Sequence, residues 1–128
     1  MKQSLKNITI LILGIIIGMI INIGLIVFGG FVFSPSETFD PMNAINWDFR
    51  YFIFPFLAHS IGTLSGAFIT SKLTRNNHMI IPFIVGLYFL SGGIYMATIL
   101  PAPIWFISLD LILCYIPMAF FGWKISNY

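Results

Sequence analysis

The chain has little charge and almost no cysteine. Only 8% of its 128 residues are Asp, Glu, Lys or Arg, and the formal net charge is +2. That charge is too small and too scattered for a nucleic-acid surface, so no nucleic-acid partner is expected. The single cysteine, Cys114, excludes an internal disulfide and a paired-thiol redox motif. No metal-ligand spacing, cofactor motif or nucleophile–base set is visible, so we predict no metal, no cofactor and no enzyme.

Most of the sequence consists of long apolar runs. The composition is 59% hydrophobic and the mean hydropathy is +0.97, values typical of a chain that lies in a bilayer. The length leaves room for one domain, residues 1–128. We predict an all-α, integral membrane four-helix bundle, with the lipid bilayer as its main partner. Its spans are expected at about 8–30, 51–71, 79–100 and 103–123, with an outer loop at 34–50.

The first apolar run, Ile8–Phe33, follows a short basic start. It is longer than the hydrophobic part of a signal peptide, and no cleavage motif follows it. We therefore expect an uncleaved first span. A helix of this length exceeds a hydrocarbon core of about 30 Å, so it must tilt or emerge near Gly29 and Gly30.

The loop at 34–50 allows two interpretations. Asp40-Pro41 is suited to be the N-cap and first residue of a short helix lying in the membrane interface, and Trp47 and Tyr51 are suited to headgroup level. An irregular loop accounts for the same residues.

Prolines mark the later spans. Pro55 and Pro82 lie near the starts of the second and third spans, while Pro101 and Pro103 separate the third from the fourth. Pro117 should loosen the fourth span as a hinge or a simple kink.

The basic residues predict the orientation. Lys2, Lys6, Lys72, Arg75 and Lys124 flank the two termini and the turn between spans two and three, where His78 is expected to be solvated. Only Arg50 lies on the other side. The positive-inside rule therefore places both termini in the cytoplasm.

Small residues recur at helical spacing in three spans. Helices in lipid approach closely where side chains are small, so these positions are candidate packing sites. The pattern fits contacts inside one bundle or a dimer face. The residues are Gly14 and Gly18, Gly62 and Gly66, and Gly86 and Gly93.

Polar residues from all four spans fall at one depth. Counted from the outer helix ends, Asp110 and His59 lie about 10 and 12 Å below the surface. A buried acid normally finds a partner, and His59 is the titratable group at that level. We call the set the polar layer and expect its amide and hydroxyl groups to complete the hydrogen bonds of this pair. Its members are Asn22, His59, Ser60, Thr63, Ser91 and Asp110.

Two functions remain open for such a layer. It can be a polar clamp in a structural or accessory membrane subunit that binds another membrane protein. It can also be a proton or ligand site in a small-molecule transporter or permease acting as a homodimer.

Several short segments resemble a group of small four-span hypothetical membrane proteins of bacteria. The resemblance implies a multi-pass protein of the bacterial cytoplasmic (inner) membrane and carries no activity. The segments are Phe54-Pro55-Phe56-Leu57-Ala58-His59, Gly62-Thr63-Leu64, Gly66-Ala67-Phe68, Pro101-Ala102-Pro103, Trp105-Phe106, Asp110-Leu111, and Tyr115, Pro117 and Ala119.

Overall fold

The computed structural model describes residues 2–74 and 79–128, and every regular element in this part of the chain is an α-helix. Four stretches are long and apolar enough to cross a membrane, so the chain is a multi-pass membrane protein with a four-helix bundle. Arg75 and His78 lie outside the described residues. The helices are α1 (Lys2–Val32), α2 (Arg50–Leu73), α3 (Ile80–Ile99), α4 (Ile104–Leu113) and α5 (Ile116–Ser126).

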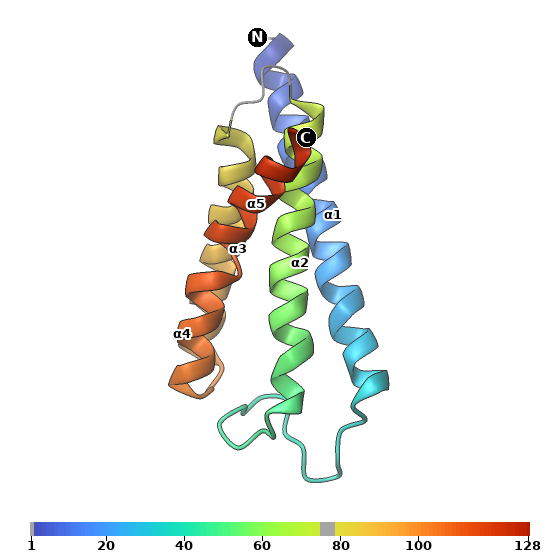
Figure 1. Cartoon of the computed structure of the whole chain (residues 1–128). Helices are drawn as coiled ribbons and strands as arrows, with labels where there is room; N and C mark the ends of the chain where they lie inside the picture. The colour runs from blue at the N-terminus through green and yellow to red at the C-terminus, as the bar shows by residue number, and fades with distance from the viewer. Residues whose placement is uncertain (1, 75–78) are drawn as a thin grey trace.

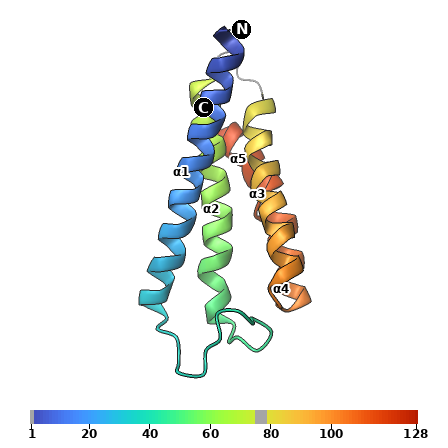
Figure 2. The ribbon, with the colours of Figure 1, turned by 180° about the vertical axis from the view of Figure 1, so that it is seen from behind.

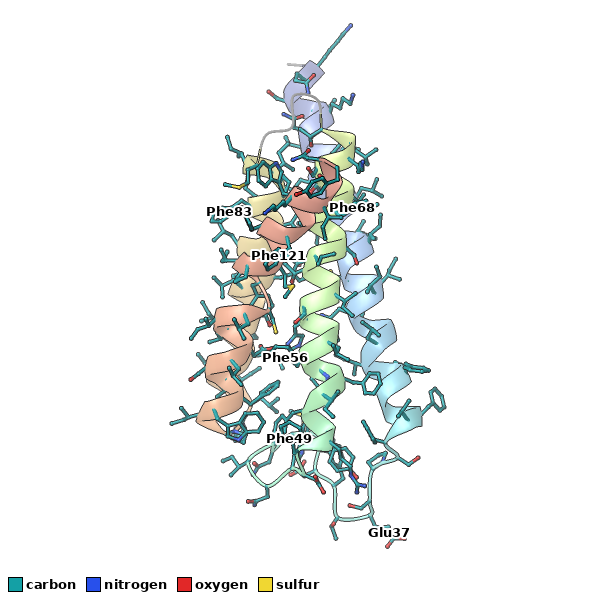
Figure 3. All side chains as sticks on the ribbon, viewed as in Figure 1. Glu37, Phe49, Phe56, Phe68, Phe83 and Phe121 are labelled. Carbon is teal, nitrogen blue, oxygen red and sulfur yellow. The ribbon has the colours of Figure 1, made fainter. Side chains whose placement is uncertain are left out.

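The helices run alternately up and down. Both termini lie at one end of the bundle, and the loop at 34–50 lies at the other (Figure 1). Glu37 lies at the tip of that loop (Figure 3). Seen from behind, the pair α1–α2 and the pair α3–α4 separate toward the loop end (Figure 2).

The first helix is longer than the predicted span. It begins at Lys2 and continues past Gly29 and Gly30 to Val32, so the helix does not end at the glycine pair. No proline interrupts the chain before Pro35, and nothing else here stops a helix. At 31 residues it spans about 46 Å, longer than the hydrocarbon core.

The loop at 34–50 is irregular, so the alternative of a short interfacial helix is wrong. Asp40 accepts a hydrogen bond from the Met42 N–H at 2.9 Å, which makes a local turn instead of a helix cap. The Asn43 side chain likewise accepts a hydrogen bond from the Ile45 N–H at 3.2 Å. Such side chains offer the backbone an alternative to helical hydrogen bonds. The Ala44 N–H, at 2.7 Å from the Pro101 carbonyl, ties the loop to the turn between α3 and α4.

Glycines bring α1 and α2 into backbone contact. A Cβ on Gly18 would lie 2.8 Å from the Gly62 carbonyl oxygen, and a Cβ on Gly62 would lie 2.8 Å from that of Gly18. Gly14 and Gly66 oppose each other in the same reciprocal way, at 2.9 and 2.7 Å. We call these four residues the glycine seam. Its contacts lie within one chain.

Small residues also join α3 and α5. A Cβ on Gly86 would lie 2.7 Å from the Ala119 Cβ, and one on Gly93 would lie 2.6 Å from the Tyr115 hydroxyl. Gly122, which the sequence analysis did not single out, lies against the Leu64 carbonyl oxygen at 2.5 Å. The second helix therefore packs closely on α1 at one face and on α5 at another.

The fourth span is broken in two. Its first part, α4, ends at Leu113, four residues before Pro117. In a continuous helix the N–H of residue 117 would bond to the Leu113 carbonyl, but proline has no N–H and its ring clashes there. The break at residues 114–115 is thus the local consequence of Pro117, and it lies next to the buried acid.

Candidate functional site

The helices α2 and α4 bring His59 and Asp110 together. The imidazole Nδ1 lies 2.6 Å from the carboxyl Oδ1, the pairing that their matched depths predict. The Asp110 side chain is 8% exposed and that of His59 is 24% exposed. Because the bond uses Nδ1, the Nε2 edge of the ring remains for another partner.

Tyr115 completes the site from the helix break. Its hydroxyl donates to Asp110 Oδ2 at 3.0 Å, and its ring stacks on His59 at 5.9 Å between centroids. In an unbroken helix, residue 115 would point about 140° away from residue 110. Only the break turns the phenol back to the acid. The sequence analysis missed this residue, and the available signal was Pro117, which breaks the helix just before it.

The other members of the polar layer do not bond to this pair. The Ser60 hydroxyl donates to the Cys114 sulfur at 3.1 Å. Ser91 donates to the Tyr88 carbonyl oxygen at 2.6 Å, and its side chain is exposed. Asn22 Oδ1 and Thr63 Oγ1 are buried and have no hydrogen-bond partner in the described part of the chain. The expectation that these groups complete the pair's hydrogen bonds is wrong, because helix rotation directs them elsewhere.

A cavity of about 880 Å³ lies beside the pair. It occupies the space between the two helix pairs toward the loop end. Its wall is largely apolar, and the loop closes over it with Phe39, Ala44 and Trp47. The polar groups that reach it from the helices are Asn22, Arg50, Tyr51, His59, Tyr88, Ser91, Tyr95, Asp110 and Tyr115.

The cavity has one closed side and one exposed side. Between α2 and α4, Phe52 packs on Phe106 at 4.6 Å and on Trp105 at 5.1 Å between ring centroids, and Phe52 is 3% exposed. On the side of α1 and α3 the lining residues are exposed, with Tyr95 at 63% and Ile26 at 45%.

The site's chemistry is that of an acid, an imidazole and a phenol in a mostly apolar pocket. In residues 2–74 and 79–128, no group of three His, Cys, Asp or Glu side chains is arranged to hold a metal ion. Comparison of the chain with protein-family models, curated proteins and solved structures gives no match.

Proposed function

We propose that the chain binds and carries a small amphipathic molecule across a bacterial cytoplasmic membrane, in exchange with a proton. One observation supports this most: the bonded pair of His59 and Asp110 forms part of the wall of a cavity large enough for a ligand. Ionisable groups within membrane spans mark proton and substrate paths in many transporters. A broken helix beside such a site is also a common transporter feature.

The pair can couple a ligand to a proton through charge alone. With a neutral imidazole and an ionised carboxyl, the site carries one negative charge. A proton on His59 brings that charge to zero, and so does a bound cation. Because two positive charges in one apolar pocket repel each other, proton and cation compete for the site.

The alternative is an accessory subunit in which the pair is only a polar clamp. A clamp needs bonded partners and no cavity. The contacts of Ser60 with Cys114 and of Ser71 with Ser126 have that character, since all four residues are buried. The pair of His59 and Asp110 differs from them because it faces open volume.

The orientation is part of the proposal. Lys2, Lys6, Lys72 and Lys124 support cytoplasmic termini, with the 34–50 loop outside. A reporter active only outside the cytoplasm should work when fused after Asn43 and remain silent after Lys124. The reverse result would overturn this orientation.

Proton exchange on ligand binding tests the function. The full chain in lipid nanodiscs would be mixed, in weak buffer with a pH indicator, with alkyl probes that end in an amine, an alcohol or a carboxylic acid. We expect one probe to release or take up protons in the wild type and not in Asp110→Asn, which remains folded because an amide still hydrogen-bonds. If no probe gives a proton signal that depends on Asp110, the clamp is the better account.

A further inference from the structure

We infer that the ligand is a lipophilic amine that enters the cavity sideways from the bilayer, between α1 and α3. This inference rests on the proposed function and names its substrate class and its route.

The two ends of the cavity are unequal. At the water-facing end the loop covers it, held by the Ala44–Pro101 hydrogen bond and by Trp47, whose Nε1–H donates to the Asp40 carbonyl oxygen at 2.9 Å. Ala44 is 2% exposed. Arg50 also lines that end, with its Nε 3.9 Å from the Asp48 carboxylate.

The membrane-facing side is open instead. Gly30 on α1 and Gly92 on α3 both line the cavity, and within the described residues no atom beyond the glycine's own stretch of helix lies within 4 Å of where either Cβ would be. Tyr88, Tyr95 and Met96 line it as well and are 46%, 63% and 47% exposed. A molecule dissolved in the lipid therefore meets an entrance at this side, and the helices diverge here (Figure 2).

Three polar groups in the wall can accept a hydrogen bond from a ligand. The Asp110 carboxylate has acceptor capacity beyond its bonds to His59 and Tyr115. In its neutral form His59 offers Nε2 as an acceptor, and the Ser91 oxygen offers another because its proton is donated to the Tyr88 carbonyl oxygen. An alkylammonium supplies several donors and a positive charge, and its alkyl chain suits the apolar wall.

A proton should displace the amine. The titratable or charged groups that face His59 and Asp110 from the surrounding elements are Tyr115 at the break, Cys114 beside it, Tyr88 and Tyr95 on α3, and Arg50 and Tyr51 at the loop end. None of these offers a second carboxylate. A proton bound by the pair removes the negative charge that holds the amine, so proton and amine exclude each other.

Photolabelling of the full chain in lipid nanodiscs tests this. The probes are an alkylamine with a diazirine in its chain and the matched alcohol and carboxylic acid, and labelled peptides are located by mass spectrometry. We expect the amine to label α3 between Tyr88 and Leu100. Gly92→Phe should lower this yield about tenfold by filling the entrance. Gly30→Phe, on α1, should lower the yield in the same way. It serves as the test if Gly92→Phe does not fold.

Gly24→Phe is the matched control. Gly24 also has open space around its missing Cβ, but it does not line the cavity. Undiminished labelling in Gly92→Phe and Gly30→Phe would overturn the lateral route of entry, but it would not contradict ligand binding in the cavity. Stronger labelling by the alcohol or acid would overturn the amine. If no probe labels the cavity in the wild type, the proposed ligand-binding function fails as well.

Discussion

The two faces of α2 differ in how closely they pack against their neighbours. The face toward α1 consists of glycines whose missing side chains let two backbones touch, as at Gly18 and Gly62. The face toward α4 carries His59, which reaches across to Asp110 at the wall of a cavity. The first face packs α1 and α2 closely together. Looser packing at the second leaves space where an ionisable group can meet a ligand.

The largest effect should follow from filling the glycine seam. Gly62→Leu places a branched side chain against the Gly18 carbonyl and the Asn22 side chain, and backbone cannot yield as a flexible side chain does. We expect the free energy of unfolding to fall by about 3 kcal/mol. Denaturant unfolding in mixed micelles measures it.

Gly24→Leu is the control for that variant, since nothing lies near its Cβ. Gly29 is not a suitable control, although it was expected at a helix end. It is buried, and its Cβ would meet the Phe54 side chain. Equal loss in Gly24→Leu and Gly62→Leu would mean that the seam has no special role.

A smaller loss should follow from removing the imidazole. His59→Leu removes the imidazole partner of the buried Asp110 and leaves its bond to the Tyr115 hydroxyl, so we expect a loss of about 2 kcal/mol in the same unfolding assay. The double variant His59→Leu with Asp110→Leu should recover part of that loss, because no charge is then buried alone. Simple addition of the two single effects would show that the residues are not coupled.

The smallest effect is expected at the phenol. Tyr115→Phe removes one hydrogen bond to Asp110 and keeps the ring, so it should cost about 1 kcal/mol. The number of protons exchanged when the amine probe binds should also change, because the carboxylate no longer accepts the hydrogen bond of the Tyr115 hydroxyl. If Tyr115→Phe matches the wild type in both measurements, the Tyr115 hydroxyl has no role in the site.

Much of this architecture could be predicted from local sequence. Apolar length predicts four spans, and counting residues from the helix ends places His59 and Asp110 at one level, since the rise per residue of a helix is constant. The spacing of Gly62 and Gly66 predicts a packing face but does not indicate which helix packs against it. The tight contact of Gly122 was missed, because a lone glycine in a span has no pattern.

The sequence by itself determined the number of spans, the depth of the buried acid and histidine, and the break that Pro117 forces. These follow from hydropathy, helix rise and a missing N–H, all of which act along the chain. Tertiary structure decided that Tyr115, once turned by that break, bonds to Asp110, that the Asn22 oxygen has no partner among the described residues, and that a cavity opens between α1 and α3. Those features depend on how far each helix rotates and how the pairs separate, and packing between distant residues sets both.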